Sequence, residues 1–299
     1  MKCDMPRPTL SVITPSYNHA AYLDQAIEAV VGQTRPPDEY LILDDASTDD
    51  SLARIELQAA AHRSIRVLRN ERNQGVVRSL SRLVREARGD YIFCAAADDY
   101  ALPGFFERAI QMAEQHPQAG VIFGRMIAVD AQGHVLRQYG ASRYHEPVFI
   151  PPDHFLCDYL EREPAYRSLS AATIYRRDCL LEVGGFRPEL GHWCDTFAIR
   201  AIALKYGACY VPELFTAWRK LPDGLSQGTR RRLRESFTIV DRAAELMRSP
   251  ALADRFPPAH VRRWRRNYRR AIVLGYAKCV AQRWISTVGA AIIRKRDVA

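Results

Sequence analysis

Two apolar runs in the first third of the chain each lead into a pair of aspartates. The first is Leu41–Asp45, and the second is Tyr91–Asp99, in which three alanines separate the apolar run from the acids. Short apolar runs bounded by turn-forming residues are typical of buried strands, so both acid pairs should lie at strand ends. Two strands that deliver acids to one edge of a sheet can bind a nucleotide together with a divalent cation. The pattern therefore points to a protein that handles a metal-bound diphosphate.

Strands and helices alternate along the first hundred residues. The expected strands are Leu10–Thr14, Leu41–Leu43, Ile65–Leu68 and Tyr91–Cys94, with helical patterns between them. This order predicts an α/β fold, with a mostly parallel sheet covered by helices on both faces. Ligands of such sheets bind beyond the carboxyl ends of the strands, where Pro15–Asn18 and both acid pairs lie.

The middle of the chain is less regular. After Pro103 and Gly104 we expect a helix to about Gln115, then a strand near Val121–Phe123 and a loop over Ala141–Pro152. A further helix is expected from Thr196 to Tyr206, directly after Asp195.

Positive charge is concentrated in the last quarter of the chain. The net charge is +9, from 43 Lys and Arg against 34 Asp and Glu. Residues from Gly228 onward hold 18 of the bases and 5 of the acids, so the preceding part has 25 against 29. We therefore expect one α/β domain over residues 1–228 and a basic helical appendage over residues 229–299.

The cysteines and the N-terminus indicate a cytoplasmic protein. The seven cysteines form no Cys-x-x-Cys pair and no cluster with histidine, which is typical of reduced thiols and not of a disulfide framework or a zinc site. The first residues lack an apolar signal segment, and no window is apolar enough for a spanning helix. We expect a cytoplasmic location, with at most peripheral contact at the inner face of a membrane.

Several motifs in a fixed order together resemble family 2 glycosyltransferases. They are Ser11–Asn18, Asp44–Asp49, Asn73–Gly75, Gly89–Ile92, Ala97–Asp99, Gly184–Phe186 and Cys194–Asp195. The resemblance covers about residues 9–228 and implies the GT-A fold. It also implies a metal-dependent, inverting transfer of a sugar from a nucleotide-sugar donor to a hydroxyl acceptor.

The first two motifs are expected to bind the nucleotide. An ionised carboxylate accepts hydrogen bonds, so Asp45 can read the N3–H of uracil or thymine, and the resemblance assigns this role to the second acid of the pair. A UDP- or TDP-sugar is therefore the expected donor. Pro15 and Tyr17 would line the base, with the Tyr17 ring stacked on it. The alternatives are a helix-capping role for Asp45 and an ordinary loop position for Tyr17.

The second acid pair matches the metal-binding motif of the family. The resemblance makes Asp99 the ligand of Mn²⁺ or Mg²⁺ and places Asp98 toward the ribose or the metal. This chain has Ala96 where an acid is common, which leaves fewer carboxylates for the cation. The alternative is a turn-forming acid pair.

Two later positions complete the expected site. Asp195 matches the general base of the family, which takes the proton of the acceptor hydroxyl, although Cys194 replaces an acid that often precedes it. Asp195 could instead cap the helix expected at Thr196. Arg78 could bind a phosphate of the donor, or it could be an exposed helix arginine. Trp218 and Arg219 resemble a late segment of the family, and their role is left open.

Two other functions are compatible with parts of this sequence. A nucleotidyltransferase should have a Gly-rich loop with a lysine near the first strand, and Pro15–His19 has neither. A non-catalytic protein of the same fold that binds a nucleotide-sugar or RNA is the alternative, supported only by Ala96 and Cys194. We expect a sugar or lipid-linked acceptor, in bacterial envelope or polysaccharide synthesis.

The appendage carries arginines interleaved with aromatic residues over Arg262–Arg270. Such a segment can bind RNA, an anionic membrane surface or a second subunit. Because an envelope acceptor favours a membrane, we expect peripheral membrane contact or a homo-oligomer, and we do not expect a nucleic-acid partner. Packing of a solvated helical face is the remaining alternative.

Overall fold

A computed structural model describes residues 7–140, 144–160, 170–221 and 233–296, without the side chains of 158, 159 and 278–296. The chain divides into two compact units, Met1–Leu221 and Pro222–Ala299. The boundary predicted between residues 228 and 229 lies outside the described residues.

The first unit is built on one mixed sheet, which has ten strands in the described part of the chain. Its parallel part has the order β3-β2-β1-β4, and β9, β6, β10 and β5 continue the same sheet, while β7 pairs with β6 and β8 with β10. The strands are β1 Leu10–Ser16, β2 Glu39–Asp44, β3 Ile65–Arg69, β4 Tyr91–Cys94, β5 Tyr100–Ala101, β6 Val121–Val129, β7 Val135–Tyr139, β8 Val148–Ile150, β9 Thr173–Arg176 and β10 Ala208–Arg219. β9 runs antiparallel to both of its neighbours.

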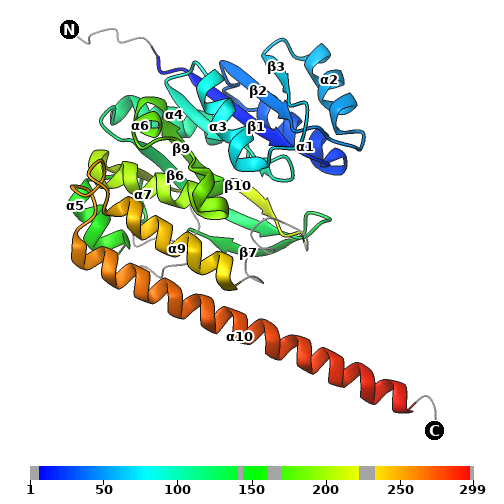
Figure 1. The fold of residues 1–299 in the computed structure, drawn as a ribbon. Helices are drawn as coiled ribbons and strands as arrows, with labels where there is room; N and C mark the ends of the chain where they lie inside the picture. Colours follow the sequence, from blue (N-terminus) through cyan, green and yellow to red (C-terminus); the bar gives the residue numbers. More distant parts are fainter. Residues whose placement is uncertain (1–6, 141–143, 161–169, 222–232, 297–299) are drawn as a thin grey trace. The chain divides into compact units, whose positions relative to one another are not determined.

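Helices flank this sheet, as Figure 1 shows. They are α1 Ala20–Val31, α2 Ser51–Ala61, α3 Val76–Glu86, α4 Phe105–Gln115, α5 Pro152–His154, α6 Arg177–Glu182 and α7 Cys194–Tyr206, with short π or 3₁₀ turns at Phe155–Leu160, Ser170–Ala172 and Pro188–Trp193. The expected α/β fold with a mainly parallel, helix-covered sheet is confirmed.

Three local expectations need correction. The strand expected near Val121–Phe123 continues to Val129, because β10 and β7 pair with its second half. The segment expected as a loop contains β8, an edge strand that pairs antiparallel with β10. Helix α7 begins at Cys194 and not at Thr196, so Asp195 lies in its first turn and Trp193 is its N-cap residue.

A group of buried aromatic rings fixes the strand-to-helix passage that carries the second acid pair. The Phe105 ring stacks on Phe215 at a centroid distance of 4.3 Å and meets Phe93 edge-on at 5.0 Å. Phe106 lies 5.5 Å from Phe93, and all four rings are buried. Aromatic packing of this kind is among the largest contributions to a core. It anchors β4, α4 and β10 around the turn that contains Asp98 and Asp99.

Two helices make up most of the described part of the second unit, α9 Leu233–Met247 and α10 Pro258–Arg296. Asp241 of α9 pairs with Arg265 Nε at 2.8 Å and with Arg269 Nη1 at 2.8 Å, and the Arg269 guanidinium lies 4.5 Å from the Phe237 ring centroid. Pro258 is the first residue of α10, a position that lacks an intrahelical partner for the missing N–H. Pro257 and Pro258 thus mark the start of the second of the two helices.

Helix α10 is much longer than α9 and extends past it (Figure 1). Its exposed residues Val273 and Leu274 are 51% and 65% accessible. None of the helices in the described residues is both long and apolar enough to cross a bilayer.

Candidate active site

The carboxyl ends of β2, β1 and β4 lie side by side and bring most of the predicted residues to one edge. β1 is the central strand, with Pro15 opposite Leu43 of β2 and Ile13 opposite Cys94 of β4. The Asp45 N–H donates to the Ser16 carbonyl at 2.8 Å, which extends the β1–β2 pairing by one residue. Pro15, Asp45 and the Asp98–Asp99 turn therefore lie at the carboxyl ends of three adjacent strands, as predicted.

The loops that follow β1 and β2 are bonded to each other. The Asn18 N–H donates to Ser47 Oγ at 3.0 Å, and the Thr48 N–H donates to Asn18 Oδ1 at 2.8 Å. Asn18 and Ala46 have positive φ angles of 58° and 61°. A left-handed alanine costs about 1 kcal/mol or more, and such strain clusters at functional sites. The two loops thus form one preorganised surface at the sheet edge.

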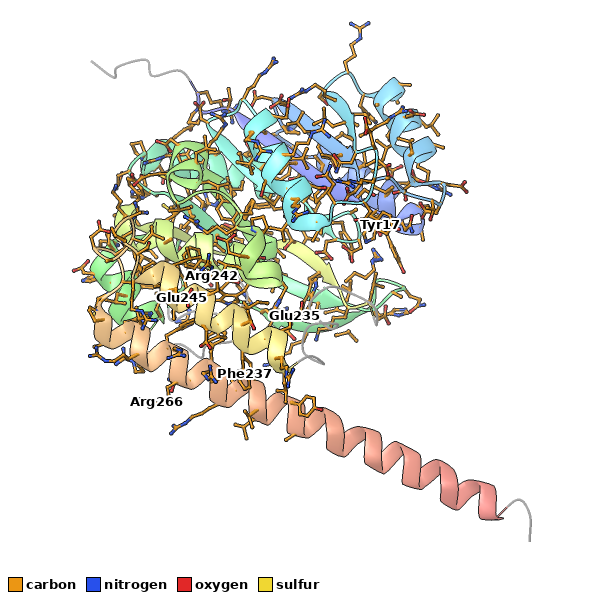
Figure 2. The ribbon with its side chains drawn as sticks, in the orientation of Figure 1. Tyr17, Glu235, Phe237, Arg242, Glu245 and Arg266 are labelled. Atoms are coloured by element: carbon orange, nitrogen blue, oxygen red, sulfur yellow. The ribbon has the colours of Figure 1, made fainter. Side chains whose placement is uncertain are left out.

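Tyr17 lies on this surface. It follows the last residue of β1 and is 39% exposed, and Figure 2 labels it there. An aromatic ring exposed at a strand end can stack on a base, so its position suits the predicted role.

The Asp45 carboxylate binds the loop between β3 and α3. Its Oδ1 accepts from Asn70 Nδ2 at 2.6 Å and from the Gln74 N–H at 2.9 Å, and its Oδ2 accepts from the Gly75 N–H at 2.8 Å. The side chain is 2% exposed. A carboxylate has about four acceptor positions, so three bonds leave one for a ligand. Asp45 both orders this loop and can still accept one N–H.

The capping alternative for Asp45 is not what the structure shows. The N-cap residue of α2 is Asp50, and Asp49 accepts from the Ser51 N–H at 3.0 Å and the Ala20 N–H at 3.1 Å. Asp44 accepts from the Ser47 N–H at 3.1 Å. Asp44 and Asp49 support the loops, whereas Asp45 faces the other way, toward α3.

Two residues that sequence reasoning missed hold the loop on its far side. Asn70 donates to Asp45 and also to Ser79 Oγ at 3.1 Å, and its Oδ1 accepts from Arg82 Nη1 at 2.6 Å. Arg82 Nη1 also donates to the Arg69 carbonyl. The Asn immediately after a strand was the available signal, since strand-end amides often bind neighbouring loops.

Arg78 lies in the first turn of α3, and its N–H donates to the Gly75 carbonyl at 3.1 Å. Its side chain is exposed. Arg78 is thus near the loop that Asp45 orders, and its phosphate-binding role stays a prediction.

The second acid pair occupies the turn between β4 and β5. Asp99 Oδ1 accepts from the Arg219 N–H at 2.7 Å, and the Asp98 carbonyl accepts from Arg219 Nε at 3.0 Å. Burial raises the pKa of Asp99 well above its ordinary value, and the adjacent Asp98 carboxylate raises it further, while the Arg219 N–H and guanidinium lower it. A cation bound beside Asp99 would offset the repulsion from Asp98 and stabilise the Asp99 carboxylate.

The acid pair suits a cation that bridges to a substrate. The described residues contain no cluster of three or more His, Cys, Asp or Glu that could enclose a metal by itself. Mg²⁺ and Mn²⁺ that serve phosphate chemistry are commonly held by one or two carboxylates together with substrate phosphates. Asp98 and Asp99 fit this arrangement, because Asp99 Oδ2 has no donor in the part of the chain that the structure describes.

Asp195 approaches the same edge from α7. Its Oδ1 accepts from the Thr196 N–H. Burial raises the pKa of Asp195, while hydrogen bonds from Thr196 and Ser170 and the proximity of His192 lower it. Burial also raises the pKa of Cys94 at the end of β4, and Cys194 and Asp195 add to that effect, so Asp195 is close to the strand that leads into Asp98.

Solved structures share this fold. TarS from S. aureus (residues 1–349), in complex with UDP-GlcNAc, aligns with a TM-score of 0.66 at 18% identity, covering 83% of this chain and 69% of TarS. The mannosyltransferase PcManGT from Pyrobaculum calidifontis, in complex with GDP-Man and Mn²⁺, aligns with a TM-score of 0.60 at 19% identity, covering 96% and 80%. At these identities the likeness establishes the fold.

Sequence comparison gives the family. EpsE from Bacillus subtilis is 35% identical over 179 residues, which are 58% of this chain and 64% of EpsE. The chain thus matches less than two thirds of the length of this relative. The model of the family described as glycosyl transferase family 2 matches residues 11–184, more than half of the chain. The resemblance of the motifs is confirmed, and the chain belongs to glycosyl transferase family 2.

Proposed function

We propose that this protein transfers a sugar from a UDP- or TDP-sugar to a hydroxyl acceptor with inversion at the anomeric carbon. The observation that carries the proposal is the division of carboxylates at one sheet edge. Asp45 has one acceptor position left for a base, the Asp98–Asp99 pair has acceptors for a cation, and Asp195 approaches from a separate helix. These are the three tasks of a one-step sugar transfer.

The nucleobase of the donor is the first feature that the site would select. Solved structures of this fold include complexes with a uridine and with a guanosine nucleotide sugar, so the fold alone does not select the base. Asp45 supports a pyrimidine, because uracil and thymine both present an N3–H donor to a fixed acceptor. Tyr17 would stack on the ring, Pro15 would line it, and Arg78 would reach a phosphate.

A metal ion and a general base would complete the chemistry. A Mn²⁺ or Mg²⁺ ion held by Asp99, with Asp98 beside it, would neutralise charge that develops on the departing nucleoside diphosphate. Asp195 would take the proton of the acceptor hydroxyl as the new bond forms. A single carboxylate base suffices for direct displacement, and no carboxylate nucleophile is required.

The acceptor is proposed to be a sugar or a lipid-linked sugar of a bacterial envelope or polysaccharide, reached at the inner face of the membrane. Helix α10 carries two stripes of arginine, and the exposed stripe supports this proposal. Arg265 and Arg269 pair with Asp241, whereas Arg262, Arg266 and Arg270 are exposed.

The three exposed arginines recur every four residues and so lie along one stripe of α10. No carboxylate pairs with them among the residues described, and Figure 2 shows Arg266 on the side of α10 away from α9. The exposed Val273 and Leu274 follow within one turn of Arg270. An unpaired basic stripe that continues into apolar residues fits an anionic membrane surface.

Asp45→Asn should weaken UDP binding by about 1.5–3 kcal/mol, because a hydrogen bond to a charged acceptor is lost. Isothermal titration with UDP, TDP, GDP and ADP measures both affinity and base preference. Asp49→Asn is the matched control, since Asp49 also accepts two backbone N–H bonds in a strand-end loop. Asp49→Asn should leave the preference for UDP over GDP unchanged. A wild type that prefers a purine diphosphate would contradict the role of Asp45.

Asp99→Asn should abolish the increase in UDP affinity that Mn²⁺ produces, because a neutral amide is a poor ligand for a hard cation. The amide oxygen can still accept from the Arg219 N–H, so the turn should stay folded. Titration of UDP in Mn²⁺ and in chelator measures the effect. Equal binding and turnover of the wild type in chelator would show that no metal acts here.

Asp195→Asn should keep donor affinity and lower the transfer rate by about 10²–10⁴-fold, the usual contribution of a general base. Because the pKa of Asp195 is raised, the rate of the wild type should begin to fall at a higher pH than for an exposed aspartate, as protonation removes the base. Initial rates of UDP release against pH, with an acceptor extract, give both results. A variant with a near-normal rate would leave Asp195 as a structural residue of α7.

Changing Arg262, Arg266 and Arg270 together to Gln should release the protein from vesicles that contain anionic phosphatidylglycerol. Each arginine near such a surface contributes about 1 kcal/mol, and the attraction should weaken with salt. The control triple, Arg234→Gln, Arg242→Gln and Arg248→Gln, removes the same charge from α9 and its end. Equal losses in the two triples would show that only net charge matters. Unchanged vesicle binding, together with a change in solution mass, would favour a homo-oligomer.

A further inference from the structure

Arg219 is a buried cation without an ion pair in the part of the chain that the structure describes. It is the last residue of β10 and is 5% exposed. Burying a charge is costly unless hydrogen bonds and other charges compensate. No ion pair among the described residues includes Arg219, although the neighbouring β4–β5 turn contains the carboxylates of Asp98 and Asp99.

The guanidinium joins three other segments through neutral acceptors. Nε donates to the Asp98 carbonyl at 3.0 Å, Nη1 to the Ala131 carbonyl at 3.3 Å, and Nη2 to Gln25 Oε1 at 2.6 Å. These acceptors belong to the β4–β5 turn, the β6–β7 turn and α1. The guanidinium spreads its donors over three nitrogens in a rigid plane and so reaches three separated acceptors, whereas the donors of a lysine share one nitrogen.

Two aromatic rings enclose the same guanidinium. Its carbon lies 4.6 Å from the Tyr22 ring centroid on α1 and 5.7 Å from the Tyr100 ring centroid on β5. Cation–π contacts partly replace lost hydration and restrict the side chain to one position. The main chain of Asp98 is therefore tied to α1 and to the sheet.

The backbone of Arg219 orients the neighbouring acid. Its N–H occupies Asp99 Oδ1 at 2.7 Å, which leaves Asp99 Oδ2 as the oxygen without a donor in the described part of the chain. Since Ala96 stands where another acid is common, the orientation of this one carboxylate has more influence on the bound cation.

We propose that Arg219 is a positioning residue, which fixes the Asp98–Asp99 turn so that one oxygen of Asp99 is presented to the cation and the donor diphosphate. This inference rests on the proposed function, because it concerns how the acids meet a nucleotide. The positive charge of Arg219 is not itself the ligand for the diphosphate. Arg219 acts by fixing the position of the Asp98–Asp99 turn and the orientation of the Asp99 carboxylate.

The test is the ratio of the UDP dissociation constant in chelator to that in Mn²⁺, measured by calorimetry on the full chain. Arg219→Met should lower this ratio by about 10- to 100-fold, the usual cost of removing a group that holds a metal ligand. Affinity in chelator should change little, because Asp45 and Tyr17 lie on other loops. Arg219→Lys keeps the charge but not the fork, and it should lower the ratio nearly as much.

Arg176→Met is the matched control. Arg176 also donates to two backbone carbonyls, of Pro117 and Gln118, and its guanidinium lies 4.8 Å from the Tyr206 ring centroid. Its loss should lower the melting temperature as Arg219→Met does, while the ratio stays at the wild-type value. Hydrogen exchange at residues 98–102, measured without metal, should rise in Arg219→Met alone.

Three results would overturn the inference: a wild-type ratio in Arg219→Met, a fully restored ratio in Arg219→Lys, or an equal fall in Arg176→Met. The first would make Arg219 structural, the second would make its charge sufficient, and the third would indicate general destabilisation. Failure of the proposed function appears separately, as a wild type that does not bind UDP. If Mn²⁺ does not change the UDP affinity of the wild type, both the metal role of Asp99 and this inference are wrong.

Discussion

Parallel pairing of β2, β1 and β4 is the constraint on which the site depends. Because these strands are adjacent and run in one direction, their carboxyl ends meet at one edge of the sheet. Residues that are distant in sequence, such as Asp45 and Asp99, are thereby brought to the same edge of the sheet. The helices between the strands make this possible, since a parallel connection needs a crossover on a face of the sheet.

Such an edge gathers like charges, and the protein handles each acid differently. Asp45 is held by two backbone N–H groups and the Asn70 amide, which fix the direction of its carboxylate. Asp99 has a single N–H bond and a raised pKa, so it gains most when a cation arrives. Asp195 accepts from Thr196 and still has a raised pKa, which suits a group that must exchange a proton. The same residue type can thus serve three purposes, because each carboxylate has a different set of neighbours.

The second unit follows a separate logic. Asp241 pairs with both Arg265 and Arg269, which fastens α9 to α10, while the stripe of Arg262, Arg266 and Arg270 stays exposed. An enzyme that works on lipid-linked or envelope acceptors gains from a surface that raises its concentration at the membrane. The charge is divided accordingly, since the part of the chain before Gly228 is slightly acidic, with 25 bases against 29 acids, and the remainder is strongly basic.

The sequence by itself determined the main strands and the edge of the sheet at which the aspartates lie. The apolar runs ending in Asp45 and Asp99 depend on period and on turn residues, which are local properties, and both strands lie where they were predicted. Tertiary structure decided which partners each acid has. Arg219 bonds to an acid 120 residues away, and Asn70 bonds to Asp45 across 25 residues, and no local pattern encodes either contact.

The same reason explains the local errors. β8 is a strand because the edge of β10 pairs with it, and α7 begins two residues early because Trp193 and Cys194 are buried against the rest of the unit. Period and propensity describe a segment in isolation, whereas pairing at an edge and burial at a helix start depend on what the fold brings to that segment. The sequence therefore located the acids, and the folded chain decided how each is held.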